Sequence, residues 1–166
     1  MTERNEVGAV YTAAVAQGLA LVTFPAASTV FTSSSYYGLS RSQYGGMFLP
    51  QVATAITASL LGAGLARAWG TRRIFLIGLL ANLLSMLVLL LSQSVMTAQP
   101  LAYVLLLVAT ACLGIGFGLT VPSLNTMVAA FFPSTIDRAV LILNALLGLG
   151  TVLAPVFVAV FIGLGN

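Results

Sequence analysis

The 166-residue chain is 60% hydrophobic, with a mean hydropathy of +1.10, six arginines, three acidic residues and a net charge of +3. This composition excludes an ordinary soluble domain, because the apolar surface exceeds what a fold in water can bury. The chain has no histidine and one cysteine, Cys112, which excludes an intrachain disulfide, a His/Cys metal cluster and histidine-based catalysis. Membrane orientation explains the arginine excess better than nucleic acid does. We therefore predict an integral membrane protein that is not an enzyme and needs no metal or cofactor.

Long apolar runs follow one another along the chain and predict five transmembrane helices, since about 20 such residues cross a bilayer. The predicted fold class is an all-α polytopic bundle that forms a single domain over residues 1–166. Short connections between the spans make neighbouring helices antiparallel. The fourth span is long enough to be tilted or to project beyond the hydrocarbon. The spans are expected at residues 8–32, 44–66, 74–93, 101–132 and 138–163.

Arginine placement predicts the orientation, because basic residues favour the cytoplasmic side of a membrane. With the N-terminus inside, five arginines lie on the cytoplasmic side, and only Arg41 lies on the other. We therefore expect a cytoplasmic N-terminus and an external C-terminus at Asn166, in a bacterial inner (plasma) membrane. The five cytoplasmic arginines are Arg4, Arg67, Arg72, Arg73 and Arg138.

Glycines recur at positions where transmembrane helices need to approach closely. Gly114 and Gly118 form a G-x-x-x-G face in the fourth span, and Gly148 and Gly150 lie in the fifth. A glycine-rich phosphate loop is the rival interpretation of residues 114–118. That loop requires a preceding strand and an aqueous helix start, so the pattern favours helix packing.

The segment between the second and third spans, Gly62–Arg73, resembles the signature cytoplasmic loop of the major facilitator superfamily. That pattern is a glycine, three residues, an aspartate, a basic residue, any residue, a glycine and then basic residues. Gly70, Arg72 and Arg73 match it, whereas Arg67 stands where the family has the aspartate. The loop also follows the second span, which is its place in the family.

Three further segments resemble parts of the same family and extend the likeness over nearly the whole chain: residues 38–45, 114–126 and 144–155. The resemblance implies the N-terminal half of a twelve-helix transporter, truncated after about five helices. A half without its partner lacks the second wall of the substrate cavity. We therefore expect a fragment of a longer carrier, one part of a split carrier, or a remnant that packs in another assembly.

Uncharged polar residues are the candidates for lining a path, because no ionisable residue lies within the spans. That lack argues against a proton relay in this part of a transporter. By the resemblance, Gln17, Gln51, Asn125 and Asn144 are the substrate-path candidates. The alternative for each is a hydrogen bond to a neighbouring helix, and Asn82 favours that packing role more strongly.

The resemblance implies alternating-access transport of a small polar or anionic solute, with a partner half. The alternative function is a non-transporting accessory subunit packed in a larger integral-membrane complex. Arg72 and Arg73 either clasp the other half, as in the family, or orient the chain against lipid headgroups. The expected partners are membrane lipid and another membrane polypeptide, and not nucleic acid.

Overall fold

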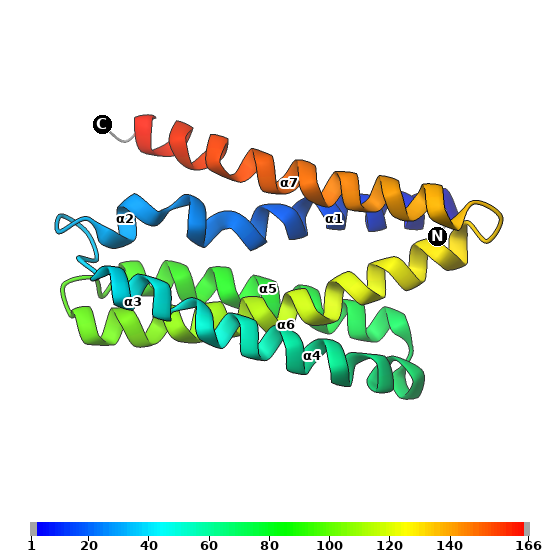
Figure 1. Cartoon of the computed structure of the whole chain (residues 1–166), viewed down its shortest axis with the longest axis horizontal. Helices are drawn as coiled ribbons and strands as arrows, with labels where there is room; N and C mark the ends of the chain where they lie inside the picture. Colours follow the sequence, from blue (N-terminus) through cyan, green and yellow to red (C-terminus); the bar gives the residue numbers. More distant parts are fainter. Residues whose placement is uncertain (1–2, 165–166) are drawn as a thin grey trace.

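The structure is a computed structural model that describes the backbone of residues 3–164 and the side chains of residues 5–160. Within residues 3–164 all regular structure is α-helical (Figure 1). The helices, in chain order, are α1 (Glu3–Ala26), α2 (Ser28–Thr32), α3 (Arg41–Gly46), α4 (Phe48–Trp69), α5 (Thr71–Gln93), α6 (Gln99–Phe131) and α7 (Ile136–Leu164).

Five of the described segments are long and apolar enough to cross a membrane, which confirms the predicted all-α, five-span class. The first is α1 followed by α2, and the second is α3 followed by α4. Pro25 lies one residue before the end of α1, and Ala27 interrupts the helix without redirecting the chain. Met47 interrupts the second span in the same way and still donates its N–H to Gln43 O at 3.0 Å.

Helix caps move the ends of the second span outward from the expected residues 44–66. Ser40 forms a capping box with Gln43, so the helical segment begins at Arg41. At the other end α4 continues past Arg67 and stops at Gly70, whose φ of +88° is open to glycine but strained for other residues. Hydropathy marks the part of a helix that lies in lipid, whereas these local bonds determine where the helix begins and ends.

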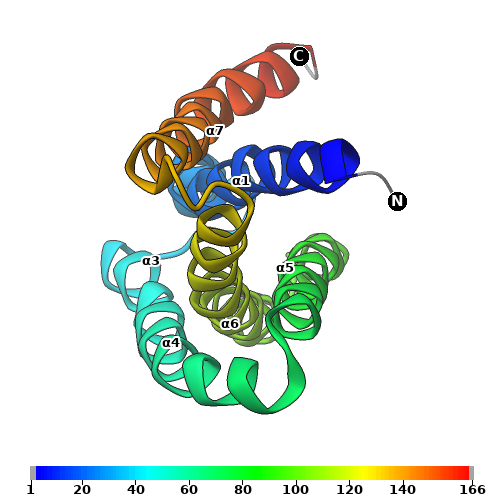
Figure 2. The same cartoon turned by 90° about the vertical axis from the view of Figure 1, so that its right-hand side faces the viewer.

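The central helix of the bundle is α6, which packs most extensively against α4 and α5 (Figure 2). The principal partner of α1 is α7, and both helices also contact α6. In the same view α4 and α5 lie on opposite sides of α6, and α7 crosses α1 obliquely.

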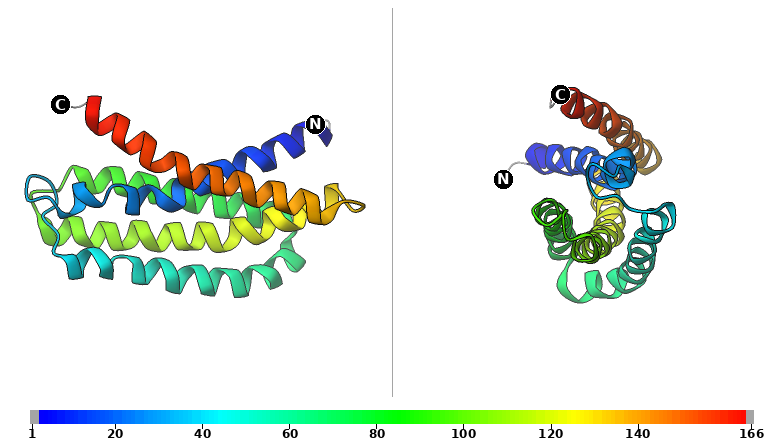
Figure 3. Two further views of the ribbon diagram at one scale, coloured as in Figure 1. Left: turned by 45° about the horizontal axis from the view of Figure 1, so that its top comes forward. Right: turned by 90° about the vertical axis from the view of Figure 1, so that its left-hand side faces the viewer.

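The arginines are distributed unequally between the two ends of the bundle. The start of α1 and the α4–α5 and α6–α7 connections share one end (Figures 1 and 3). Arg67, Arg72, Arg73 and Arg138 lie there, so we call it the arginine-rich end; Arg41 lies at the opposite end. The Arg4 side chain and Asn166, both used in the orientation argument, lie outside the described residues.

At the opposite end, the loop between α2 and α3 is fixed onto the α5–α6 hairpin. Tyr37 Oη and Ser92 Oγ are hydrogen-bonded at 2.7 Å, and Gln99 Nε2 donates to Gly38 O at 2.7 Å. Phe31 stacks on Phe24 with ring centroids 6.0 Å apart, and this aromatic pair is buried. The loop therefore acts as a strap that joins the first span to the third and fourth.

The outward surfaces of the helices are apolar, as a lipid environment requires. Leu60 on α4 is 75% exposed and Leu80 on α5 is 64% exposed. The described buried side chains include amides and hydroxyls but no Asp, Glu or Arg. Lipid rather than water is therefore the solvent for the outer face.

Candidate functional site

Gln17, the path candidate on α1, is bonded to α5 in the interior of the bundle. Its side chain is 2% exposed, and Asn82 Nδ2 donates a hydrogen bond to Gln17 Oε1 at 2.6 Å. Gln17 Nε2 and Asn82 Oδ1 are buried without a hydrogen-bond partner in the described part of the chain. This pair gives α1 a polar link to α5, which is the role the sequence favoured for Asn82.

A glycine on α6 makes room for this amide pair. A Cβ at Gly116 would overlap Asn82 Oδ1, and a Cβ at Gly78 would overlap Thr120 Oγ1. The α5–α6 contact is therefore formed by glycines opposite polar side chains. Thr120 is fully buried, and its hydroxyl oxygen is also without a partner in the described structure.

Gln51, the candidate on α4, lies along the contact between α4 and α6. Its backbone oxygen and the Thr54 hydroxyl occupy the space where a Cβ of Gly114 would lie. Thr54 Oγ1 is 2.8 Å from Ala111 O on α6, an inter-helix hydrogen bond. Gln51 is half-buried, and its Oε1 atom is enclosed without a partner among the described residues.

Asn125 lies farther along α6, towards the arginine-rich end. Its Nδ2 donates to Val121 O at 3.1 Å within the same helix, and its Oδ1 atom is buried and unpartnered in the described part. Asn125 follows Gly114 by eleven residues, about 16 Å along a helix that rises 1.5 Å per residue. Gln51 and Asn125 therefore lie at different depths of the bundle.

Asn144, the candidate on α7, is exposed, and its Nδ2 donates to Val140 O at 3.0 Å. It is the only one of the four candidates with an exposed side chain. Gln17 faces α5 at the level of Gly116, whereas Gln51 lies at α4 beside Gly114, on a different side of α6. The four side chains thus do not meet in one pocket among the described residues, and their path role stays a prediction.

The four glycines singled out for packing have different surroundings. A Cβ at Gly118 would overlap Ala55 O on α4, and a Cβ at Gly150 would overlap Val15 O on α1. Gly114 is equally close to α4. Gly148 differs, because a Cβ there would meet nothing within 4 Å, so it packs against no helix in the described structure.

The α4–α5 loop carries the residues that match the family signature. Gly70 turns the chain with its positive φ, and Arg67 lies exposed in the last turn of α4. Arg72 forms an ion pair with Glu6 of α1, with 3.9 Å between Nη1 and Oε1. Their side chains are 71% and 38% exposed, so solvent screening limits the pair to about 0–1 kcal/mol. The acid that faces Arg72 is thus on α1 and not in the loop.

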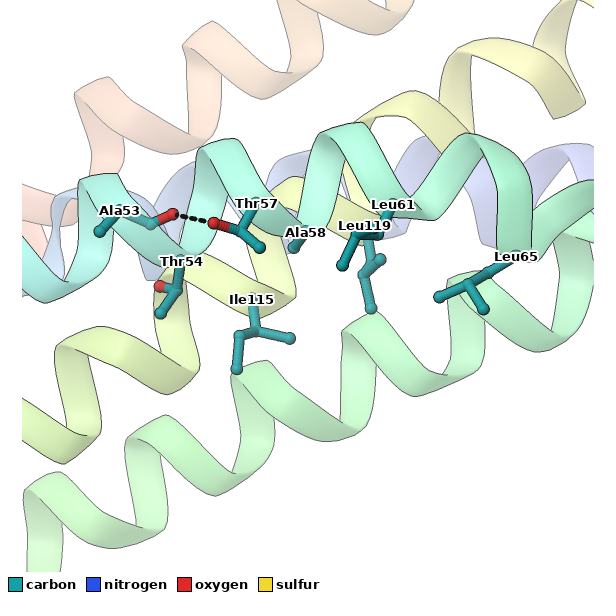
Figure 4. A pocket seen from close by; sticks show the side chains of 8 residues that line it. All are labelled: Ala53, Thr54, Thr57, Ala58, Leu61, Leu65, Ile115 and Leu119. Carbon is teal, nitrogen blue, oxygen red and sulfur yellow. Dashed lines mark hydrogen bonds between the residues drawn. The ribbon is translucent and has the colours of Figure 1, made fainter.

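A groove of about 400 Å³ lies beside α4 and α6 (Figure 4). Its walls are apolar apart from Thr54 and Thr57. Thr57 Oγ1 donates to Ala53 O at 2.8 Å, and Thr54 is bonded as described above. None of the four path candidates lines this groove, so it presents apolar surface to lipid rather than a polar site to a solute.

Several hydroxyl contacts between helices are not foreseen from the sequence. Ser85 Oγ donates to Ala109 O at 2.7 Å, and Ser59 Oγ donates to Gly118 O at 3.2 Å. A serine within an apolar span signals such a bond, but the sequence does not tell which helix receives it. Within the described residues, His, Cys, Asp and Glu form no group that could hold a metal ion.

Comparison with known proteins gives one match. The family model described as "Major Facilitator Superfamily" matches residues 9–166, nearly all of the chain. Neither the curated proteins nor the solved structures contain a match. The family model covers the five spans, the signature loop and the central α6, so the chain belongs to the major facilitator superfamily.

Proposed function

We propose that this chain forms part of an alternating-access carrier for a small polar or anionic solute and works together with further transporter helices. Membership of the superfamily implies a secondary transporter, and its members are in general not enzymes. The family match carries the proposal. The arrangement supports it, because α4 packs on α6, α7 packs on α1, and α1 and α6 contact each other, so the four spans form one continuous assembly (Figure 2). The first, second, fourth and fifth spans are those that line the path in the family.

Asn144 is the candidate whose side chain is already accessible to a solute, because it is exposed on α7. The oxygens of Gln51 and Asn125 have no partner among the described residues but are buried, so they reach a solute only if the helix contacts around them open. Gln17 takes part in the path only if its bond to Asn82 opens, because that bond holds its amide against α5. We rank Asn144 first as a contact for the solute.

The residues that couple transport to an ion belong, in this proposal, to further helices. The buried side chains of the described part include no carboxylate, and a membrane-embedded acid is the usual proton carrier. In this proposal the amide side chains of this chain recognise the solute, and a charged residue on the further helices couples its transport to an ion. These further helices come from another polypeptide or from a continuation of this one.

The orientation that we propose places the arginine-rich end in the cytoplasm of a bacterial cell. Four arginines of known position lie at that end and one at the other, as the positive-inside rule requires. The lipid bilayer and the remaining transporter helices are then the partners of the chain.

The experiment that tests the transport proposal is purification of the native protein in mild detergent, followed by mass spectrometry of what co-purifies. We expect polypeptide that carries the remaining helices. The reconstituted assembly should then take up solute into liposomes, and Asn144→Ala should weaken uptake more than Thr12→Ala, an exposed residue on α1. Stable assembly with an unrelated membrane complex, without uptake, would refute the carrier.

An accessory subunit is the second candidate, and one observation favours it. Arg67 stands in place of the signature aspartate, and Arg72 instead pairs with Glu6 of α1. The charge network by which the loop would hold the other half is therefore altered. Association with an unrelated membrane complex in the same experiment would support this function.

A further inference from the structure

A second apolar space lies between α1 and α5 at the arginine-rich end. Its volume is about 300 Å³, and its walls are Ala9 and Ala13 on α1 and Phe75 and Leu79 on α5, with Met127 of α6 also lining it. The small side chains of α1 leave this space, because an alanine reaches less far towards α5 than a leucine. We call it the α1–α5 crevice.

Charge is concentrated at one rim of this crevice. Arg72 and Glu6 both line it, and their ion pair at 3.9 Å joins the two helices there. Arg73 and Arg67 are exposed nearby in the chain, at the loop that leads into α5. The Arg72 side chain is 71% exposed, so its guanidinium is accessible to a stronger partner than Glu6.

An apolar space next to an arginine is complementary to an amphipathic anion, a molecule with one charged end and one apolar end. The guanidinium binds phosphate through two parallel hydrogen bonds, which a carboxylate 3.9 Å away does not match. The walls offer no hydrogen bond to a water-soluble anion but accept a hydrocarbon chain. The arginine and the apolar walls lie together at one end of the bundle, where a bilayer presents a lipid headgroup and its acyl chain side by side.

We propose that the α1–α5 crevice binds one anionic phospholipid. Its phosphate lies on Arg72 and displaces Glu6, and one acyl chain lies between α1 and α5 against Phe75 and Leu79. Arg73 and Arg67 add attraction for the anionic headgroup. The lipid fills the space between the two helices, which the described residues also join through the Gln17–Asn82 hydrogen bond. This site is independent of the proposed transport.

Native mass spectrometry of the purified full chain with added phosphatidylglycerol or phosphatidylcholine tests the site. We expect phosphatidylglycerol to be retained in preference, and Arg72→Gln to weaken its binding about five-fold, the effect of one basic residue at an anionic surface. Arg41→Gln removes the same charge at the opposite end and should leave binding unchanged. Glu6→Gln should strengthen binding, by up to about five-fold, because it removes the competing carboxylate.

A second pair of variants tests the acyl chain without changing any charge. Ala13→Leu fills the crevice and should reduce retention of phosphatidylglycerol, whereas Ala53→Leu, in the groove of Figure 4, should not. Equal retention of the two lipids, or equal effects of Arg72→Gln and Arg41→Gln, would overturn the proposal. A photoreactive group at Leu76 that labels a polypeptide instead of lipid would also overturn it, because a protein helix would then occupy the crevice.

Discussion

Gly118 and Gly148 belong to similar glycine-rich patterns, but only Gly118 has backbone of another helix in the place of its missing Cβ. The atom that a Cβ of Gly118 would overlap is Ala55 O, part of a rigid helix backbone that cannot rotate away. Gly148 has no atom within 4 Å of that position. Close helix approach in a membrane depends on such contacts, so the two residues should respond differently to the same change.

We expect Gly118→Ala to lower stability by about 1–3 kcal/mol, because the added methyl forces α4 and α6 apart. Gly148→Ala is the matched control and should be neutral or stabilising by up to about 1 kcal/mol, since alanine favours helix over glycine. Melting of the purified protein in detergent measures both. Equal melting temperatures for the two variants would contradict the close contact of α4 with α6.

A second prediction for single residues concerns the hydrogen bond between Gln17 and Asn82. Asn82→Leu or Gln17→Leu leaves one buried amide without its partner and should cost about 1–3 kcal/mol. The double variant removes both amides and should be less destabilised than the two single effects added together. Interaction energies of this kind in membranes average ~0.6 kcal/mol and reach ~1.7. Strict additivity in the same melting assay would show that the two amides do not interact.

At the scale of elements, the loop between α2 and α3 is held by bonds from two side chains on other spans. Tyr37 is 5% exposed and hydrogen-bonded to Ser92, whereas its neighbour Tyr36 is 50% exposed. The loop thus transmits the position of the first span to the α5–α6 hairpin.

We expect Tyr37→Phe to destabilise the protein by about 0.5–1.5 kcal/mol, because it removes one buried hydrogen bond and leaves Ser92 with only its bond to Leu89 O. Tyr36→Phe removes the same hydroxyl from an exposed ring and should have no effect. Proteolysis within residues 33–40 should also become faster in the first variant only. An equal rate for both variants would mean that the loop is not held by this bond.

The sequence predicts where the helices lie along the chain better than it predicts which helices pack against each other. Apolar runs were sufficient for five spans, since hydropathy depends on the residues themselves. The start at Arg41 depends on a side-chain bond between Ser40 and Gln43, which hydropathy does not register. The pairing of Gln17 with Asn82 joins residues 65 positions apart, and nothing in either segment specifies it. Likewise, the G-x-G pattern at Gly148 does not reveal that no helix lies beside it.

In the whole molecule, the loops that connect the five spans lie at two opposite ends of the bundle. Ser35 and Thr97 are exposed at one end, and Ser134 is exposed at the arginine-rich end. The membrane orientation therefore follows from labelling a few positions from one side.

In a background with Cys112→Ala, we expect a membrane-impermeant thiol reagent outside intact cells to label Ser35→Cys and Thr97→Cys. Ser134→Cys should be labelled only after the cells are opened, because the arginine-rich end faces the cytoplasm. Reversed labelling would place the N-terminus outside. Labelling of all three variants in intact cells would indicate that the chain does not form a uniform five-span bundle.

The central position of α6 also has a consequence for synthesis. The ribosome delivers α1, α4 and α5 to the membrane before the helix that they all contact, and α1 meets α7, its principal partner, last. Until then the face of α1 around Gly18, which later lies against Leu147 and Gly150, has no protein neighbour. We therefore expect the first helix to stay unassembled until α7 has entered the membrane, and nascent chains that stop before residue 136 should be recognised by membrane proteases as unassembled.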